Sequence, residues 1–511
     1  FVLLSLLGMM AALIADKMRP GMVLFSVVVL FLCAGILTPK EMLEGFSNKG
    51  MITVALLFLV SEGIRQSGTL GQVIKKLLPQ GKTTVFKAQL RILPSVAFIS
   101  AFLNNTPVVV IFAPIIKHWA KSVKLPATKF LIPLSYVTIL GGICTLIGTS
   151  TNLVVHGMIL EAGYEGFTMF ELGKVGIFIA IAGIIYLFIF SKRLLPDARP
   201  DTAVPDEEVE EGEKLHRVEA VLGARFPGIN KKLSDFNFQR HYGAEVKEIK
   251  TRNGQRYVDH LEDVVLREGD TLVVMADDTF IPTWGESSVF VLLTNGNDPD
   301  TSGKKKRWLA LILLVLMIVG ATVGELPATK EMFPDIKLDM FFFVCITTII
   351  MAWTNIFPAR KYTKYISWDI LITIACAFAI SKAMVNSGVA DCVAGFIIGL
   401  SDDYGPHVLL AILFVITNLF TELITNNAAA ALAFPLALSI SAQLGVSPTP
   451  FFVVICMAAS ASFSTPIGYQ TNLIVQGIGN YKFTDFVRIG LPLNIITFLI
   501  SVILIPLIWN F

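Results

Sequence analysis

Long apolar segments, separated by short polar loops, dominate the pattern of hydrophobic and polar positions along this chain. Crossing the hydrocarbon core of a bilayer takes about 20 apolar residues in a helix. The pattern predicts membrane-spanning segments near residues 1–15, 21–38, 51–64, 132–158, 173–191, 308–325, 338–353, 367–385, 451–478 and 490–509. Two further apolar stretches, 92–116 and 407–440, contain polar asparagine motifs. We therefore expect a polytopic α-helical membrane protein.

Residues 192–306 lack this apolar pattern. They begin with an acidic stretch and continue as a mixed sequence, in which short apolar runs such as Thr271–Met275 alternate with turn signals such as Asn253-Gly254. This region predicts a small α+β domain inserted into the membrane protein. The expected organisation is a first membrane half at 1–191, an insert with linkers at 192–306 whose core covers about 216–280, and a second membrane half at 307–511.

The two membrane halves repeat one another. Several residues of the first half recur in the second half at an almost constant distance along the chain. The pairs 320 positions apart are Ser61 and Ser381, Gly68 and Gly388, and Asn152 and Asn472, and the pairs 321 positions apart are Asn105 and Asn426, and Pro114 and Pro435. An ordered series of this kind indicates an internal duplication, with the insert between the two copies.

The charges of the loops indicate that the two repeats have opposite orientations. Loop 65–91 carries six Lys or Arg residues and no acid, whereas its repeat partner 386–406 carries three Asp residues and no base. Cytoplasmic loops are enriched in Lys and Arg, so the two loops lie on opposite sides, as an inverted repeat requires. On this scheme the insert is cytoplasmic, the C-terminus is outside, and the protein lies in the plasma or bacterial inner membrane.

Each repeat contains an apolar stretch that enters and leaves the membrane on the same side. Basic residues flank 92–116 at both ends, at Arg91 and Lys117. This predicts a re-entrant hairpin with Asn104-Asn105-Thr106-Pro107 at its tip. The repeat predicts a second hairpin, entering from outside, with Thr425-Asn426-Asn427-Ala428 at its tip.

A second polar motif follows each hairpin. The motif 148–152 (Gly-Thr-Ser-Thr-Asn) ends 47 residues after Asn105, and the motif 468–472 (Gly-Tyr-Gln-Thr-Asn) ends 46 residues after Asn426. Polar side chains and turn-forming backbone are tolerated at membrane depth where they line a protein-walled site. Duplicated broken helices of this kind indicate the substrate site of a transporter.

Broken helices supply groups that bind ions of both signs. On one side of each break, free backbone carbonyls suit a hard cation such as Na⁺, and on the other side free N–H groups suit an anion. The motif cores contain no Lys or Arg. An anion would therefore be held by neutral donors and helix dipoles, and bound cations would balance its charge, which couples the two binding events.

Composition narrows the classes of function. The 511 residues are 54% hydrophobic and 16% charged, with a mean hydropathy of +0.69, which excludes an ordinary soluble protein. Basic residues lie in short loops, so a nucleic-acid partner is not expected.

The six cysteines lie in apolar stretches without a CxxC pair, and we expect small buried packing residues with no disulfide or metal role. Because the chain opens at Phe1 inside an apolar run, we also expect residues before it.

Three charged residues, Glu62, Lys382 and Glu422, lie within apolar segments. An ionisable group at membrane depth is a functional candidate, and a proton-coupled antiporter would depend on such a carboxylate. Glu422 precedes Asn426 by four positions, but its repeat partner is Ala101, so we favour a structural bridge or a role in orienting the hairpin. No nucleophile–base arrangement indicates an enzyme, and the paired hairpins argue against a ligand-gated channel.

With these motifs, the membrane halves resemble the divalent anion/sodium symporter family over about 45–191 and 338–509. Members of this family have two inverted repeats, each with a re-entrant hairpin and a broken helix. The insert, near 216–280, is similar to the TrkA-C type of ligand-binding domain of potassium-channel regulators, and the run Arg267–Val274 carries this similarity. The run Ser464–Leu473 resembles the sulfate-transporter branch of the family.

The resemblance implies a homodimeric symporter that works by alternating access, with Na⁺ as the coupling ion at two or more sites, no organic cofactor, and a small-molecule ligand such as a nucleotide on the insert. It implies a first Na⁺ site at Ser100, Asn104, Asn105 and Gly148, and a second at Thr421, Ile424, Asn426 and Gly468. It places the substrate against Asn105, Thr106, Thr149, Ser150, Asn426, Asn427, Tyr469 and Gln470.

The chain departs from the dicarboxylate pattern of this family at its tips. Asn427 stands where the second tip usually has Thr, and Ser150-Thr151 and Gln470-Thr471 replace paired prolines. These changes add hydrogen-bond donors around one centre, which a compact tetrahedral oxyanion needs, whereas a C4 dicarboxylate needs two separated clusters. The sequence therefore favours sulfate or a related inorganic divalent oxyanion. A sodium-coupled dicarboxylate transporter and a proton-coupled anion antiporter are the alternatives.

Overall fold

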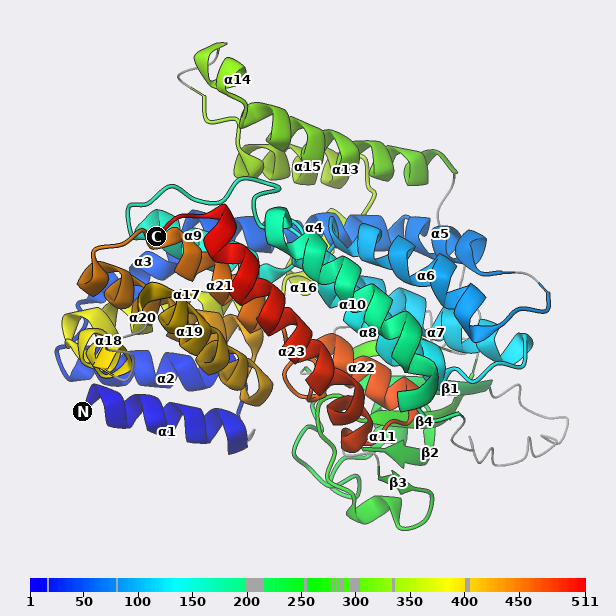
Figure 1. Cartoon of the computed structure of the whole chain (residues 1–511). Helices are drawn as coiled ribbons and strands as arrows, with labels where there is room; N and C mark the ends of the chain where they lie inside the picture. Colours follow the sequence, from blue (N-terminus) through cyan, green and yellow to red (C-terminus); the bar gives the residue numbers. More distant parts are fainter. Residues whose placement is uncertain are drawn as a thin grey trace, which may run out of the picture.

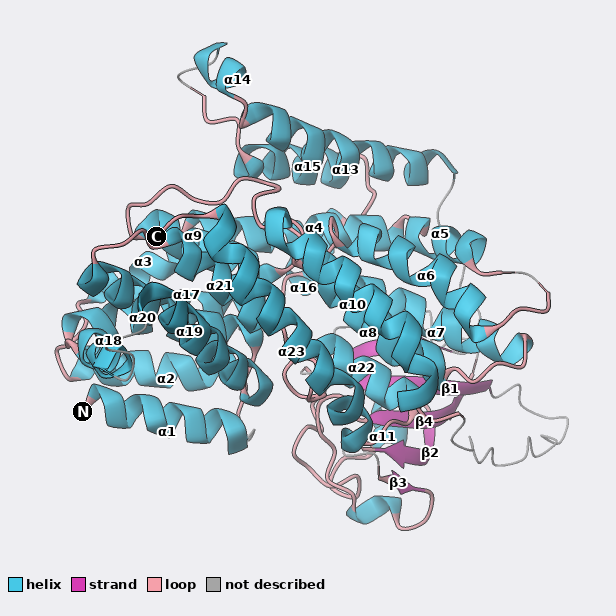
Figure 2. Ribbon diagram, in the orientation of Figure 1, coloured by secondary structure: helices cyan, strands magenta, loops and turns pink. Residues whose placement is uncertain are grey.

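A computed structural model gives the structure of this chain (Figure 1). Most of the described residues are helical, and the strands gather in one small sheet (Figure 2). The structure describes residues 1–15, 18–79, 81–197, 216–223, 225–251, 255–277, 280, 284, 289–294, 304–332, 336–399 and 405–511. The acidic stretch near 206–213 and the turn signal Asn253-Gly254 lie outside the described residues.

The helices of the first half follow the apolar segments. Their bounds are Val2–Ala15 (α1), Pro20–Cys33 (α2), Pro39–Glu44 (α3), Lys49–Gln66 (α4), Thr69–Leu77 (α5), Val85–Ser100 (α6), Asn105–Ser122 (α7), Thr128–Gly142 (α8), Ser150–Glu161 (α9) and Gly173–Leu194 (α10), with a 3-10 turn at Gly45–Ser47 (η1). Asn48 fixes the start of α4, because its side chain accepts hydrogen bonds from the N–H groups of Gly50 and Met51.

The second half repeats the order of these helices. Its bounds are Lys304–Gly324 (α13), Pro327–Met332 (α14), Met340–Trp353 (α15), Ala359–Lys361 (η3), Tyr362–Tyr365 (α16), Trp368–Asn386 (α17), Val389–Gly399 (α18), Gly405–Leu423 (α19), Asn426–Leu444 (α20), Thr449–Ser460 (α21), Gln470–Gly479 (α22) and Phe483–Ile508 (α23). The series α4–α10 corresponds in order to α17–α23. The equivalent glycines Gly68 and Gly388 both have a φ of +71°, the left-handed conformation that glycine tolerates best.

Four of the expected apolar segments are interrupted in the structure, and each interruption falls at a polar motif. The expected segment 132–158 is two helices separated by 143–149, and the segment 451–478 is two helices separated by 461–469. The two hairpin stretches also break, between α6 and α7 and between α19 and α20. The interrupted helices therefore occur twice, at equivalent places in the two halves.

Seven helical segments of the described chain are long and apolar enough to cross a membrane, namely Pro39–Gln66, α10, α13, α17, α19, α20 and α23. Their outer faces carry large exposed apolar side chains such as Ile177, Leu419 and Leu507, a surface that suits lipid. The last helices of the two halves, α10 and α23, pack side by side (Figure 1). Helices α13 and α15 form a pair that packs on α4.

The insert forms a five-stranded antiparallel sheet with the order β3-β2-β4-β1-β5. Its elements are His216–Leu222 (β1), Phe238–Tyr242 (α11), Glu245–Lys250 (β2), Arg256–Tyr257 (β3), Leu261–Asp263 (η2), Thr271–Ala276 (β4) and Phe290–Thr294 (β5). A separate apolar cluster around Phe226 and Phe290 holds the insert together. The sheet extends beyond the domain core that the sequence predicts to end near residue 280. The additional strand, β5, joins the sheet by pairing with β1.

The cysteines correct one sequence-based expectation. All six are free thiols, but Cys33 and Cys392 are exposed and only Cys376 and Cys456 are fully buried. In a membrane protein an apolar residue can face lipid as well as the core, so an apolar neighbourhood in the sequence does not distinguish the two environments.

The close packing of α6 on α8 gives a test of this fold. A Cβ atom added at Gly141 would lie 2.9 Å from Ala97 Cα and would overlap the Ala97 carbonyl, and overpacking of this kind costs about 1–3 kcal/mol. We expect Gly141→Ala to lower the midpoint of thermal unfolding in detergent. Gly8→Ala is the matched control, because nothing lies within 4 Å of the added atom. Equal midpoints for the two variants would contradict this packing.

Candidate functional site

Four helices begin at one place in the molecule. They are α7, α9, α20 and α22, and their first residues are Asn105, Ser150, Asn426 and Gln470. The first N–H groups of any helix lack an intrahelical partner. The breaks in the apolar segments therefore bring four sets of free donors toward each other.

Tyr469 joins the two halves at this place. Asn105 Nδ2 donates a hydrogen bond to the Tyr469 hydroxyl at 2.7 Å, and that hydroxyl shares a second hydrogen bond with Thr149 Oγ1 at 2.9 Å. The exposed fractions are 1% for Asn105, 2% for Thr149 and 7% for Tyr469. One buried hydroxyl thus links the first hairpin tip to the loops that precede α9 and α22.

The second hairpin tip connects to α9. Ser150 Oγ and Thr151 Oγ1 each donate to Asn427 Oδ1 at 3.2 Å. Asn426 Nδ2 donates to Thr151 Oγ1 at 2.7 Å. The two tips, which are more than 300 residues apart in the sequence, therefore belong to one polar region.

A third link completes this region, because Thr106 Oγ1 donates to Gln470 Oε1 at 3.3 Å. The structure brings together all eight residues expected at the substrate, namely Asn105, Thr106, Thr149, Ser150, Asn426, Asn427, Tyr469 and Gln470. We call this set, with Thr151, the tip network. Sequence reasoning did not assign Thr151, although its position inside the motif 148–152 could have identified it.

The tip network contains amide and hydroxyl groups and no charged side chain. The N-terminal ends of four helices of 10 to 19 residues add partial positive charge. Helix N-termini with free N–H groups bind anions. This arrangement can bind an anion through hydrogen bonds without a salt bridge.

Oxygen atoms of the first tip converge beside Gly142. A Cβ atom placed on Gly142 would lie 2.7 Å from Asn105 Oδ1 and 3.1 Å from the Gly148 carbonyl oxygen. Ser100 Oγ donates to Asn105 Oδ1 at 2.8 Å. Ser100, Asn105 and Gly148, three of the four residues expected at the first Na⁺ site, therefore lie together, and neutral oxygens of this kind suit a hard cation.

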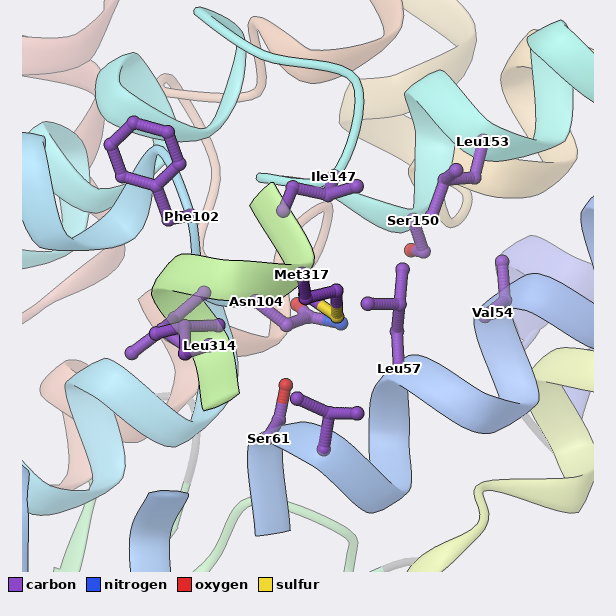
Figure 3. Close-up of a pocket in the computed structure, with 12 residues that line it drawn as sticks. Val54, Leu57, Ser61, Phe102, Asn104, Ile147, Ser150, Leu153, Leu314 and Met317 are labelled. Carbon is purple, nitrogen blue, oxygen red and sulfur yellow. The ribbon is translucent and has the colours of Figure 1, made fainter. Parts of the chain in front are cut away.

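Asn104, the fourth residue expected at that site, faces a different space. It lines a cavity of about 10 Å³ together with Ser61 and Ser150 (Figure 3). A volume of this size holds about one water molecule. The structure therefore places Asn104 on the side of the hairpin tip that faces α4 and α13.

At the second tip the expected Na⁺ ligands divide into two groups. Gly468 lies against the Thr421 carbonyl, and Thr421 Oγ1 donates to the Ala459 carbonyl at 2.6 Å. Asn426 belongs instead to the tip network, and its Oδ1 accepts from the backbone N–H of Asn427 at 3.0 Å. Ile424 is buried in the turn that joins α19 to α20.

Glu422 connects the second hairpin to the loop after α21. Its carboxylate accepts hydrogen bonds from the backbone N–H groups of Ser464 at 2.9 Å and Thr465 at 2.8 Å, and from Asn494 Nδ2 at 2.7 Å. Each of these donors suits an ionised carboxylate. The geometry fits the structural bridge favoured from the sequence.

The loops before α9 and α22 share their internal hydrogen bonds. Asn152 Nδ2 donates to the Thr145 carbonyl at 2.8 Å, and Asn472 Nδ2 donates to the Thr465 carbonyl at 3.2 Å. In both loops the threonine Oγ1 accepts from the glycine N–H three positions later, at 3.1 and 3.4 Å. The last asparagine of each motif therefore shapes its loop.

Two helical halves that meet in paired tips and broken helices define a membrane transporter as the class of this protein. The family model of citrate transporters (CitMHS) matches residues 10–440 and 332–511. The chain belongs to this family.

Proteins similar to this chain are also described as transporters. An uncharacterized transporter of Synechocystis sp. is 30% identical over 95% of this chain and 93% of its own length. A sodium/sulfate cotransporter of Chlamydomonas reinhardtii is 30% identical over 55% of this chain and 31% of its own length. A sodium-dependent dicarboxylate transporter of Staphylococcus saprophyticus is 25% identical over 28% of this chain and 28% of its own length. The protein is an integral membrane, ion-coupled anion transporter rather than an enzyme.

Tyr469→Phe tests the tip network. The variant keeps the ring but removes the hydroxyl that joins Asn105 and Thr149, and a buried polar group left without a partner costs about 1–3 kcal/mol. We expect uptake of the transported anion into proteoliposomes to fall by about tenfold or more. Tyr164→Phe is the matched control, because Tyr164 is 46% exposed outside the network. Uptake that is equally fast in both variants would rule out this role of the hydroxyl.

Proposed function

We propose that this protein is a Na⁺-coupled symporter that imports sulfate, or a related inorganic divalent oxyanion, across the plasma or bacterial inner membrane. The observation that carries the proposal is the tip network, in which neutral donors from four helix starts meet at one place. A divalent anion held by such groups keeps its full charge, so accompanying cations are needed to balance it.

Asn105 supports the coupling of the two ions. Its Oδ1 belongs to the oxygens beside Gly142, and its Nδ2 donates into the tip network through Tyr469. A Na⁺ ion bound at Oδ1 would fix the orientation of the amide and point Nδ2 toward the anion. Anion and cation would then lie close together, where their attraction is strong in a site that excludes water.

The arrangement of donors favours sulfate over a dicarboxylate. Ser150 Oγ and Thr151 Oγ1 each lie 3.2 Å from Asn427 Oδ1, so these polar groups gather around one centre. A tetrahedral oxyanion can use such a centre with all its oxygens. A C4 dicarboxylate would place its second carboxylate away from it, where a buried charge without partners is costly.

Alternating access follows from the duplicated architecture. The series α4–α10 and α17–α23 would form an inverted repeat, as the opposite charges of the equivalent loops 65–91 and 386–406 indicate. On this basis the insert is cytoplasmic and the C-terminus is outside. The protein would act as a homodimer, with the hairpins and broken helices of each protomer moving against a fixed scaffold.

The insert is proposed to be a regulatory domain of the TrkA-C type. Its five-stranded sheet and its separate apolar cluster make it a structural unit of its own. It would bind a small molecule, such as a nucleotide, and favour one conformation of the transporter through a difference in affinity.

Uptake of labelled sulfate into proteoliposomes tests the proposal. We expect accumulation that requires an inward Na⁺ gradient and that excess unlabelled succinate does not inhibit, because the donors surround one centre. Asn105→Ala, which removes both connections of that side chain, is the inactive control. Inhibition by succinate would identify a dicarboxylate carrier. Uptake driven by protons and abolished in Glu422→Gln would identify the proton-coupled antiporter and would overturn Na⁺ coupling.

A further inference from the structure

Ser61 reaches the hairpin tip from a helix that sequence reasoning did not connect with the site. It lies on α4, is 6% exposed, and lines the cavity that Asn104 and Ser150 also line. In Figure 3 its hydroxyl points into that cavity, toward Asn104. Ser150 belongs to the tip network, so this cavity adjoins the proposed anion site.

The remaining wall of the cavity is apolar. Leu57 on α4 and Leu314 and Met317 on α13 line it together with Asn104 and Ser150 (Figure 3). With a volume of about 10 Å³, the space accepts little more than a water molecule. A polar group pressed against this wall would find no hydrogen-bond partner there, which is costly.

We propose that Ser61 contacts the transported anion and that Leu314 and Met317 limit the size of that anion. This inference rests on the proposed function and names the residues that set its specificity. The Ser61 hydroxyl supplies one donor from outside the hairpins. The apolar wall excludes an anion that extends beyond the tip network, such as a dicarboxylate.

Substitutions at Ser61 and Met317 test this inference. We expect Ser61→Ala to raise the KM for sulfate several-fold at an unchanged Na⁺ dependence, and Ser61→Thr, which retains a hydroxyl, to restore it partly. We expect Met317→Ala to make uptake sensitive to succinate. Ser26→Ala and Met22→Ala are the controls, because both residues are exposed on α2.

The outcomes separate this inference from the proposed function. A wild-type protein that takes up no sulfate would refute the function itself. A different result would refute this inference alone: the wild type takes up sulfate, Ser61→Ala has an unchanged KM, and uptake by Met317→Ala stays resistant to succinate. The proposed function would then stand.

A second, independent observation concerns where the insert sits. In β1, Val218, Ala220 and Leu222 face the core of the insert, whereas Val221 packs into the apolar core of the membrane part. Glu219, on the same side as Val221, accepts hydrogen bonds from Lys117 of α7 at 3.1 Å to each carboxylate oxygen. The insert therefore contacts the helix that begins at the first tip.

The carboxyl group of Glu219 stays ionised in this contact. Burial alone would raise the pKa of this carboxyl group, but the charges of Lys117 and Lys250 and the hydrogen bond from Lys117 outweigh it and lower the pKa to about 2. The carboxylate is therefore ionised at physiological pH, and the contact with α7 persists there.

The insert also contacts α22, the helix that begins at Gln470. Gly269 lies against Leu473, and a Cβ atom added at Gly477 would overlap Thr271 Oγ1. The hydroxyl of Thr271 is buried without a hydrogen-bond partner in the structure. Packing rather than hydrogen bonding therefore joins β4 to α22.

A third contact lies outside the tip network. Arg225 Nη2 donates to the Ile366 carbonyl at 3.2 Å, in the segment before α17. Helix α17 packs on α2 and contributes no residue to the tip network. The insert thus touches both the helices that carry the site and a segment that does not.

We infer that the insert acts as a clamp that holds the site-bearing helices α7 and α22 against the segment before α17, and that transport requires at least one of these contacts to open. This second inference also rests on the proposed function, because alternating access moves the site-bearing helices relative to the rest. A ligand on the insert would regulate transport by favouring the open or the closed clamp.

A disulfide tests whether the contact must open. In Thr271→Cys/Gly477→Cys the two Cβ atoms would lie about 3.7 Å apart, within the range of protein disulfides. The background carries Ser in place of the exposed Cys33 and Cys392. We expect oxidation to stop sulfate uptake and a reductant to restore it, while oxidation leaves the uptake rate of each single-cysteine variant unchanged. A protein whose two thiols are fully oxidised but which transports normally would overturn the clamp.

Two substitutions that change how closely β4 and α22 can pack test the same contact without a cross-link. In Gly477→Ala the added methyl group overlaps Thr271 Oγ1, so we expect a several-fold higher maximal rate of uptake with unchanged Na⁺ dependence. Adding Thr271→Ala removes the overlapping atom and should return the rate to that of the wild type. A rate that Thr271→Ala fails to restore would mean that Gly477→Ala acts within α22, which would contradict the clamp. Wild-type uptake is the check on the proposed function.

Discussion

Helices that begin inside an apolar interior leave backbone N–H groups without partners, and the architecture of this transporter depends on how those groups are satisfied. Such groups cannot stay unpaired away from water without a large cost. Here α7, α9, α20 and α22 begin beside one another, and amide and hydroxyl side chains fill the space between their ends. The polar region that results is both a structural requirement and the place where an anion can bind.

This constraint explains why the two halves cannot be independent. Tyr469 connects to Asn105, and Asn427 connects to Ser150, so each half completes the hydrogen bonds of the other. The equivalent loops use the same internal hydrogen bonds, from Asn152 and from Asn472. The two halves differ at Glu422. Its carboxylate accepts hydrogen bonds from the loop after α21, whereas the equivalent position of the first half is Ala101.

Much of the fold could be predicted from the sequence because membrane helices have a strong and simple signal. Apolar length gave the helices, and the polar motifs marked their breaks. Equal spacing of these motifs predicted that Asn105 and Asn426 belong to one site, and the structure brings the eight expected substrate residues together. Asn104 lines a different space from Asn105, because neighbouring residues at a tip point in different directions and their numbering does not reveal which.

The sequence by itself determined the membrane character, the duplication, and the chemistry of the motifs, because these depend on local composition and spacing. Only the tertiary structure decided which surfaces meet. The approach of Ser61 on α4 to Asn104, the apolar wall at Met317, and the contact of Glu219 with Lys117 join segments far apart in the chain. Contacts of this kind arise from the packing of whole helices and domains, which leaves no periodic signal along the sequence.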